Sequence, residues 1–446
     1  MNLERLQSDR VQDVLHKGSQ AVFQGRVEIV SGVLVEAAGV PAALGEMCRI
    51  HRGANGHVDA EVVGFRNGST LLMPHGDLDG VAPRQLVTSL GRTFSVPCTD
   101  ELLGRVIDGY GRPIDDGPSL STRNQRSVRQ PAPSPLSRTP IDEPLQTGVR
   151  VIDSLTTIGR GQRMGIFAGS GVGKSSLLSQ ITRGTDADIV VCCLVGERGR
   201  EVQDFVHEVL GREGAPKSVM VVATSDRAPI ERYLAPFVAV TVAEHFRDQG
   251  KNVLLLMDSV TRFAGACREI GLAAGEPPTV RGYPPSFFAT VPKLVERMGR
   301  ANGGSITGLL TVLLDGDDPN EPVADTLRGL LDGHVFLSRE MASSGHFPAV
   351  DVLHSLSRLM STLATPEHQA QALSLRESLS AWRDGRDLVE IGAYKPGSNP
   401  KLDRAIQRMP IIESFLKQTP VELNSLDETL ELLSLVTGAT APGGAA

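Results

Sequence analysis

An octapeptide, AGSGVGKS at residues 168–175, constrains the fold of this chain more than any other feature. It follows an apolar run at 164–167 and precedes a helix-like run that starts at Ser176. A strand, a glycine-rich loop and a helix in this order are the context that a phosphate-binding loop requires. Glycines let successive backbone N–H groups point at phosphate oxygens, and the helix adds its positive N-terminal dipole. The sequence therefore predicts a site for a nucleoside triphosphate.

Two side chains of this loop carry the expected phosphate chemistry. Lys174 is placed to neutralise charge on the β- and γ-phosphates, and the Ser175 hydroxyl is placed to bind Mg²⁺. The consensus motif begins with glycine, whereas this chain has Ala168 at that position. The alternative is a glycine-rich turn that contains Gly-Lys-Ser by chance, but the flanking runs favour the phosphate-binding loop. The predicted nucleotide contacts are Ala168, Gly169, Ser170, Gly171, Val172, Gly173, Lys174, Ser175 and Ser176.

The composition is that of a globular protein with several domains. The 446 residues suffice for two or three domains, and 40% apolar with 22% charged residues is ordinary for such proteins. The net charge of −7 gives no basic footprint for nucleic acid. The five cysteines form no C-x-x-C pair, so we expect reduced thiols in the core. Early charges (Asp9, Arg10, Asp13) interrupt any signal peptide, and no apolar run approaches the ~18 residues of a membrane span, which favours the cytoplasm.

Changes of pattern divide the N-terminal third of the chain. Residues 1–22 are weakly amphipathic and indicate either a partner-binding arm or a loose terminus. Short β-type runs broken by Gly and Asn turns fill residues 23–117 and predict a small barrel or sandwich. Six prolines then indicate an extended linker at 118–147.

Strand-like and helix-like segments alternate from residue 148 to residue 365. This alternation predicts an α/β domain with a mainly parallel sheet covered on both faces. Ligands of such folds bind at the carboxyl ends of the strands, where the glycine-rich loop falls. The predicted strands are 163–168, 189–195, 219–224, 252–258, 306–314 and 334–337.

The C-terminal segment 366–437 indicates a helical domain, followed by a flexible tail at 438–446. Apolar residues recur there at helical spacing, and Pro410 is expected to interrupt one of the helices. Ser425 and Glu428 have the spacing of a capping box, so they predict the start of a further helix.

Two acidic residues follow strands of the predicted sheet. Asp258 ends an apolar run, and a buried carboxylate there is costly unless a cation or hydrogen bonds compensate it. Mg²⁺ bound to a triphosphate is such a cation, and a helix cap is the alternative role of Asp258. Glu197 ends the next strand after the loop, where a carboxylate can polarise the water that attacks a γ-phosphate. Arg198 would contact the same phosphate, although Glu197 and Arg198 also fit an exposed cluster of ion pairs.

Three motifs together resemble one known family. They are the glycine-rich loop preceded by GIF at 165–167, GERGREV at 196–202 and DSVTRFA at 258–264. In this order they resemble the type III protein-export ATPases, which comprise the flagellar export ATPase and its injectisome relatives. That family is itself similar to the catalytic subunit of rotary ATP synthases. The likeness runs from about residue 27 to residue 435, and members often carry alanine at the position of Ala168.

The resemblance implies a RecA-like central domain between an N-terminal β-barrel and a C-terminal helical domain, assembled as a homohexamer. It implies Mg²⁺-dependent ATP hydrolysis coupled to delivery and unfolding of export substrates. It also implies that Glu197 is the catalytic carboxylate and that Asp258 lies on the Mg²⁺ side. Arg358 matches the arginine that reaches the ATP of a neighbouring subunit. Phe347 matches an aromatic residue, often tyrosine, that packs on adenine, and no role is assigned to Asn399, where relatives often carry aspartate.

The implied partners are the regulator and stalk subunits of an export apparatus, export chaperones and substrates. The protein would then be cytoplasmic and peripheral to the export gate of the inner membrane, with no nucleic acid partner. A rotary ion-translocating ATPase subunit and an injectisome ATPase are alternatives to the flagellar branch, which residues 25–117 and 394–398 favour. A ring-shaped RNA translocase would need a basic, aromatic site in the barrel. The aromatic residues that Gly25–Gly117 offers are Phe65, Phe94 and Tyr110.

Overall fold

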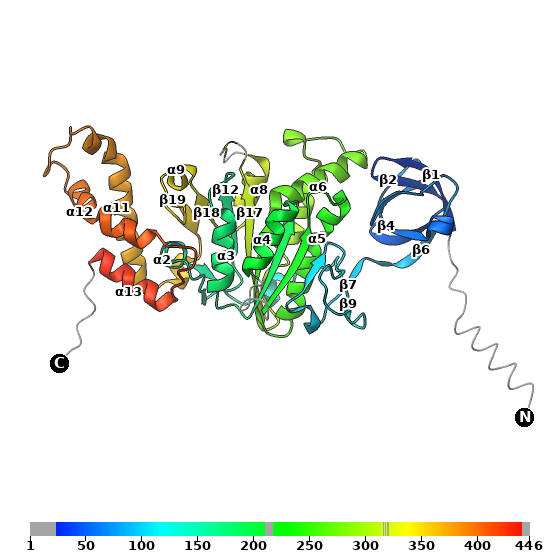
Figure 1. The fold of residues 1–446 in the computed structure, drawn as a ribbon, viewed down its shortest axis with the longest axis horizontal. Coiled ribbons are helices and arrows are strands. Elements are labelled where there is room, and N and C mark those ends of the chain that lie inside the picture. The colour runs from blue at the N-terminus through cyan, green and yellow to red at the C-terminus, as the bar shows by residue number, and fades with distance from the viewer. Residues whose placement is uncertain (1–23, 210–216, 315, 317, 319–320, 439–446) are drawn as a thin grey trace, which may run out of the picture. The chain divides into compact units, whose positions relative to one another are not determined.

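The computed structural model describes residues 24–209, 217–314, 316, 318 and 321–438, which fall into two compact units (Figure 1). The first unit contains the N-terminal strands up to Phe94 together with Leu272–Glu276, and the second contains the rest, including the predicted nucleotide site. The predicted arm at 1–22 and all but Gly438 of the predicted tail lie outside the described residues. Within the described ranges, no helix has the length and apolar character needed to cross a membrane.

Six antiparallel strands of the first unit form a closed barrel in the order β1-β2-β5-β4-β3-β6. Burial alternates along β1, where Gly25 and Val27 face inward and Arg26 faces outward, as expected for a strand with one face on a core. Pairing of β1 with β6 closes the barrel and confirms the predicted N-terminal β-barrel. The strands are β1 (Gln24–Ser31), β2 (Leu34–Ala38), β3 (Glu46–His51), β4 (His57–Arg66), β5 (Ser69–Pro74) and β6 (Leu86–Thr93), with a 3-10 turn at Gly53–Asn55.

The barrel ends before the predicted boundary at residue 117. β8 (Val106–Asp108) pairs with a strand of the central sheet, and its three residues are too few to show in the sequence which sheet they join. The proline-rich segment is also attached to the second unit, because Arg138 donates to the Met298 carbonyl at 2.8 Å. The short elements of this region are β7 (Ser95–Pro97), β9 (Gln125–Ser127), β10 (Pro144–Leu145), β11 (Ile158–Gly159) and the 3-10 turns Asp100–Leu102 and Pro135–Ser137.

A nine-stranded sheet forms the centre of the second unit, in the order β19-β18-β12-β17-β15-β13-β14-β8, with β16 paired to β17. All neighbours along the main path are parallel except β19, which runs antiparallel to β18. Every residue of β13 is buried, because helices cover both faces of the sheet. All five cysteines are buried and unpaired, which confirms the prediction of reduced core thiols. The strands are β12 (Arg163–Ala168), β13 (Ile189–Val195), β14 (Ser218–Ala223), β15 (Asn252–Asp258), β16 (Gly299–Ala301), β17 (Gly304–Leu313), β18 (Gly333–Leu337) and β19 (Val350–Ser357).

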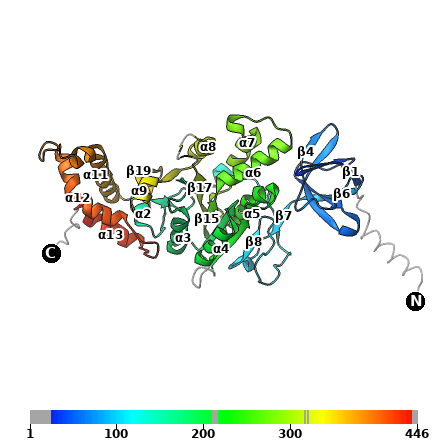
Figure 2. The same ribbon diagram turned by 45° about the horizontal axis from the view of Figure 1, so that its top comes forward.

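Helices lie on both faces of this sheet. Figure 2 shows α3 and α4 on one side of the strands and α6, α7 and α8 on the other. Right-handed crossovers account for the two groups, because the chain moves one way along the sheet through α3 and α4 and then returns. The helices are α2 (Arg150–Leu155), α3 (Lys174–Gly184), α4 (Gly199–Val209), α5 (Pro229–Arg247), α6 (Val260–Ala273), α7 (Pro285–Val295), α8 (Pro322–Leu330), α9 (Arg339–Ser343) and α10 (Met360–Leu363), with a 3-10 turn at Val280–Gly282.

Three helices follow the sheet: α11 (Pro366–Glu390), α12 (Pro400–Leu416) and α13 (Leu426–Thr437). The predicted capping box of α13 is confirmed, because Ser425 and Glu428 each accept the backbone N–H of the other. Asn399 caps α12 by accepting the N–H groups of its first turn. The expectation that Pro410 interrupts its helix is wrong: α12 continues through it, since buried apolar residues before and after Pro410 compensate the lost hydrogen bond.

Candidate active site

The sheet register brings the predicted site residues to one edge. Ala168 at the end of β12 lies opposite Leu313 of β17, and Asp258 at the end of β15 lies opposite Leu194 of β13. Glu197 follows β13 by two residues. The glycine-rich loop and both acids therefore lie at the carboxyl ends of neighbouring parallel strands, the usual ligand edge of an α/β sheet.

The glycine-rich loop has the backbone that its sequence predicts. Gly171 and Gly173 have φ of +78° and +87°, a region that favours glycine, and Gly173 is the N-cap of α3. The first N–H groups of α3 have no partner inside the helix and face an anion site. Ala168 is the buried last residue of β12, so this position of the motif is extended and has no need of glycine.

Three charged side chains meet above this loop. The Lys174 ammonium contacts the Asp258 carboxylate directly and lies 3.7 Å from Oε1 of Glu197. Their side chains are 11%, 6% and 14% exposed, so little water screens the three charges. One cation thus faces two carboxylates, which leaves a net negative site that suits a divalent cation carried by a phosphate ligand.

The surroundings of Glu197 make its carboxylate easier to protonate than one in water. Burial raises its pKa to about 7, Lys174 opposes that rise, and the nearby Asp258 charge adds to it. Its Oε1 atom is buried without a hydrogen-bond partner, which is costly unless a ligand or water supplies one. A carboxylate with a pKa near neutrality beside an open hydrogen-bonding position is suited to hold and polarise an attacking water.

Asp258 is held in place by a residue that sequence reasoning missed. Thr311, fully buried on the neighbouring β17, donates its hydroxyl to Oδ1 of Asp258 at 2.7 Å. The available signal was a hydroxyl residue inside the otherwise apolar end of that strand. This hydrogen bond fixes the orientation of the carboxylate.

The donors present fit Mg²⁺. Asp258 and the exposed Ser175 supply oxygen atoms beside the loop, and no cluster of three or more metal-ligating side chains occurs among the described residues. Mg²⁺ in nucleotide sites keeps several waters and binds few protein oxygens besides the phosphates, so this small donor set is the expected one. When bound, the ion would neutralise charge on the β- and γ-phosphates.

Phe347 comes to the same edge from the loop before β19. A methyl group placed on Gly173 would lie 3.2 Å from Cε1 of the Phe347 ring, so the ring borders the glycine-rich loop. The ring is 41% exposed, which leaves a face for a flat ligand. The Phe347 carbonyl accepts the backbone N–H of Gln418, and this bond fixes the loop to the segment after α12.

The structure does not bring the two predicted arginines to this cluster. The Arg198 side chain is 84% exposed and lies 3.8 Å from Glu201, one turn along the chain. Arg358 follows β19, whose last residue Ser357 pairs with Gly333 at the amino end of β18. Gly333 in turn pairs with Met164, so Arg358 lies at the end of the sheet opposite the loop.

A parallel α/β sheet, a glycine-rich loop that caps a helix, and paired carboxylates at the strand ends define a P-loop nucleoside triphosphatase with a RecA-like core. The nucleotide-binding domain of the ATP synthase alpha/beta family matches residues 148–357, and the C-terminal domain of the type III secretion EscN ATPase matches residues 364–434. The chain belongs to the type III protein-export ATPase family, a branch of the ATP synthase alpha/beta family.

Relatives and solved structures agree over nearly the whole chain. The flagellum-specific ATP synthase of Bacillus subtilis is 49% identical over 416 residues, 93% of this chain and 95% of the relative. The type 3 secretion system ATPase of Xanthomonas euvesicatoria is 48% identical over 414 residues, 93% and 94% of the two chains. The structure of the assembled ATPase EscN of enteropathogenic E. coli is 43% identical, covers 93% of this chain and 100% of that one, and has a TM-score of 0.88.

Proposed function

We propose that this chain is a Mg²⁺-dependent ATPase that energises flagellar type III protein export. The observation that carries the proposal is the cluster of Lys174, Glu197 and Asp258 at the glycine-rich loop. It combines a phosphate-neutralising cation, a water-polarising carboxylate and a metal-side carboxylate, the set that phosphoryl transfer to water needs. The flagellum-specific ATP synthases among the relatives give that chemistry its biological setting.

In this proposal each side chain has a separate task. The loop N–H groups and Lys174 bind the β- and γ-phosphates, and Ser175 with Asp258 holds the ion. Glu197 orients the attacking water and accepts a proton from it as the phosphoryl group passes to that water and ADP leaves. Phe347 stacks on the adenine ring. Arg198 could contact phosphate only after its exposed side chain turns toward the loop.

The proposed enzyme works as a homohexamer in which Arg358 completes a neighbouring site. The register puts Arg358 beside the amino end of β12, five residues or about 17 Å along the strand from Ala168. An arginine at that place is remote from its own loop and exposed to a second copy. The EscN ATPase, which is similar over 93% of this chain, is known as an assembly and in complex with its central stalk EscO.

Export is favoured over rotary ion transport because the C-terminal 364–434 segment matches the domain of a secretion ATPase. The proposed partners are a stalk subunit, a regulator, chaperones and export substrates, met at the cytoplasmic face of the inner membrane. The proposed domains are an arm at 1–22, a barrel whose strands end at Thr93, an ATPase domain up to residue 365 that includes β8 and the proline-rich segment, and helices at 366–437. RNA-stimulated hydrolysis would instead support the RNA translocase.

Two measurements test the ATPase. The specific hydrolysis rate should rise with protein concentration, because a neighbouring copy completes each site, and a constant rate from a verified monomer contradicts this. The Glu197→Gln variant should bind ATP as tightly as the wild type and hardly hydrolyse it. The matched control is Asp204→Asn, an exposed acid on α4 that pairs with Arg200, which should keep its rate.

The flagellar setting is tested in cells. The gene should restore motility to a bacterium that lacks its flagellar export ATPase, with Lys174→Ala as the inactive control. Restored effector secretion in a strain without its injectisome ATPase, and no restored motility, would assign the chain to the injectisome branch instead.

A further inference from the structure

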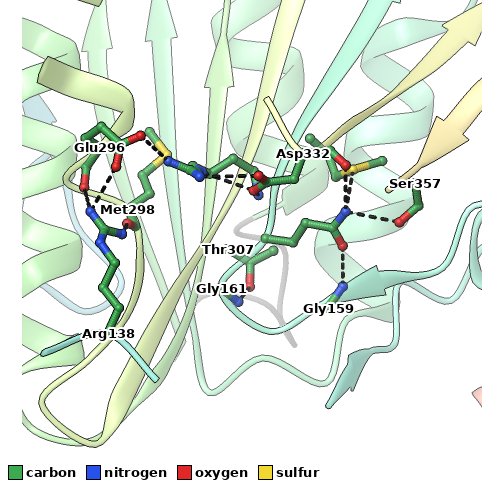
Figure 3. A network of polar contacts seen from close by, with 11 residues as sticks. Arg138, Gly159, Gly161, Glu296, Met298, Thr307, Asp332 and Ser357 are labelled. Atoms are coloured by element: carbon green, nitrogen blue, oxygen red, sulfur yellow. Dashed lines mark hydrogen bonds and ion pairs between the residues drawn. The ribbon is translucent and has the colours of Figure 1, made fainter. Parts of the chain in front are cut away.

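A polar network lies at the amino end of β12, the end opposite the glycine-rich loop (Figure 3). Its centre is Gln162, whose side chain is fully buried in the turn that enters the strand. The side-chain carbonyl oxygen of Gln162 (Oε1) accepts a hydrogen bond from the backbone N–H of Gly159 at 2.8 Å. Its amide nitrogen donates to the Asp332 carbonyl at 3.2 Å and to the Ser357 hydroxyl at 3.0 Å. A buried polar group with every atom paired fixes the segments that it joins.

The segments joined by Gln162 are those that carry Arg358. Ser357 is the residue before Arg358, and the backbone N–H of Arg358 donates to the Asp332 carbonyl at 2.9 Å. The Asp332 carbonyl therefore accepts two hydrogen bonds, one from the backbone N–H of Arg358 and one from the side-chain amide of Gln162. The Arg358 guanidinium itself donates to the Arg328 carbonyl at 3.2 Å and is otherwise exposed. Its position consequently depends on how firmly its backbone is held.

Asp332 is held from its other side as well. Its carboxylate accepts the backbone N–H and Nε of Arg163, each at 3.0 Å, and its N–H donates to the Arg163 carbonyl at 2.8 Å. Arg163 also lies 2.7 Å from Glu296, so the ion-pair chain continues to the end of α7. Asp332 thus cannot shift without breaking bonds to the first residue of β12.

We propose that Gln162, acting through Asp332 and Ser357, is a positioning residue for Arg358. This inference rests on the proposed function, in which Arg358 enters a neighbouring copy's site. An arginine that acts across an interface must hold its guanidinium in one position relative to the neighbouring site. A displacement of about 1 Å at a catalytic group can cost on the order of 10²-fold in rate. Gln162 supplies that constraint from the strand whose other end carries the subunit's own phosphate loop.

The first test separates positioning from folding. Gln162→Leu keeps the volume but removes the bonds to Asp332 and Ser357, so kcat should fall about 10- to 100-fold while the KM for ATP stays unchanged. Thr307→Val is the matched control: its buried hydroxyl accepts the N–H of Gly161 in the same turn at 2.8 Å but does not touch the Arg358 segment. It should lose comparable stability and keep its kcat. Equal losses of kcat in both variants would overturn the proposal.

A smaller change guards against a variant that fails to fold. Ser357→Ala removes the hydroxyl that receives Gln162, and Ser357→Thr keeps it. The alanine variant should lower kcat severalfold and the threonine variant should restore it. A threonine variant as slow as the alanine variant, with both folded, speaks against the hydrogen bond.

The second test uses mixed assemblies. Gln162→Leu and Glu197→Gln chains are combined in equal amounts at low concentration and then concentrated together. In random rings about one quarter of the sites pair an intact Glu197 with an intact Arg358 segment, so about a quarter of the wild-type rate should return. The reference mixture is Arg358→Ala with Glu197→Gln, which should recover equally. Gln162→Leu with Arg358→Ala should not recover, because both damage the same partner role.

The mixtures also distinguish the two levels of the argument. Recovery in the reference mixture without recovery in the Gln162→Leu mixture overturns the role of Gln162 and leaves the proposed function intact. Failure of the reference mixture, with both chains folded and assembled, overturns action of Arg358 across subunits and the role of Gln162 with it.

Discussion

The two ends of β12 differ in how their polar groups are satisfied. At the carboxyl end, one cation faces two carboxylates, and Oε1 of Glu197 is buried without a hydrogen bond. At the amino end, Gln162 has a partner for both amide atoms and Asp332 is bonded on both sides. Unpaired polar groups are costly, whereas a saturated network rigidifies. The first end is therefore built to receive a ligand and the second to hold protein in place.

The largest expected effect comes from removing the cation of the open end. Lys174→Ala should abolish measurable hydrolysis and ATP binding, because the phosphates lose their neutralising charge while two carboxylates remain. Titration with a fluorescent ATP analogue measures the binding. Lys217→Ala is the control, since that lysine donates to the Thr185 carbonyl beyond the far end of α3 and should leave binding unchanged. Wild-type binding by Lys174→Ala would refute the nucleotide site.

The next effect comes from the opposite end of the sheet. Arg358→Ala should lower kcat of the assembled protein by about 10³-fold or more, since an arginine at the transferring phosphoryl group supplies that much, and should leave ATP binding unchanged. The measurement is steady-state hydrolysis at saturating ATP together with equilibrium binding. Arg383→Ala, an exposed arginine on α11, serves as the control and should keep its kcat. A loss of ATP binding in Arg358→Ala would place that residue in its own subunit's site.

The pH dependence is a smaller effect and follows from Glu197. Because burial raises its pKa to about 7, hydrolysis should fall toward tenfold per unit as pH drops below 7. A folded pKa above the ordinary value means that ionising Glu197 destabilises the native state as pH rises from about 4.5 to 7. Glu197→Gln should therefore raise stability at pH 8 by about 3 kcal/mol and change it little near pH 4.5. Denaturant unfolding at the two pH values checks this, and equal changes at both would contradict it.

The smallest effect is expected at the ring beside the loop. Phe347→Ala should raise the KM for ATP about tenfold, since stacking of a base on an aromatic ring contributes about 1–3 kcal/mol, and should leave kcat near the wild-type value. Phe347→Tyr keeps the stacking face and should behave as the wild type. If the KM values for ATP and for GTP change by the same factor across these variants, the ring recognises a flat base and not adenine in particular. An unchanged KM for ATP in Phe347→Ala would remove the proposed role of Phe347.

The sequence predicted the open end of β12 better than the saturated end. Three strands, 163–168, 189–195 and 252–258, were predicted to the residue, because each is a continuous apolar run that ends in a motif. β19 was not predicted, since polar residues alternate along this edge strand. Arg358 could be singled out only through the family resemblance, because nothing local distinguishes it from a surface arginine.

The residues missed share one property: their partners are distant in sequence. Thr311 meets Asp258 and Gln162 meets Ser357 only after the sheet has formed. A polar residue within an apolar run indicates that its side chain forms a buried hydrogen bond, but the sequence does not indicate which residue is the partner. The outward turn of Arg198 matches the alternative that the sequence left open, an exposed cluster of ion pairs, because the sequence does not decide between two rotamers of an exposed side chain.

Closure of the N-terminal barrel also affects how copies of this chain can associate without aggregating. Over the described residues 24–93, β1 pairs with β6 along Gln24–Arg26, so the main-chain hydrogen-bonding groups at this seam already have partners within the chain. An open margin would let neighbouring copies zip together strand to strand into aggregates. Domains closed in this way can adhere only through side chains, and such contacts can be undone. Contacts that form between the N-terminal barrels of neighbouring copies during assembly are therefore reversible.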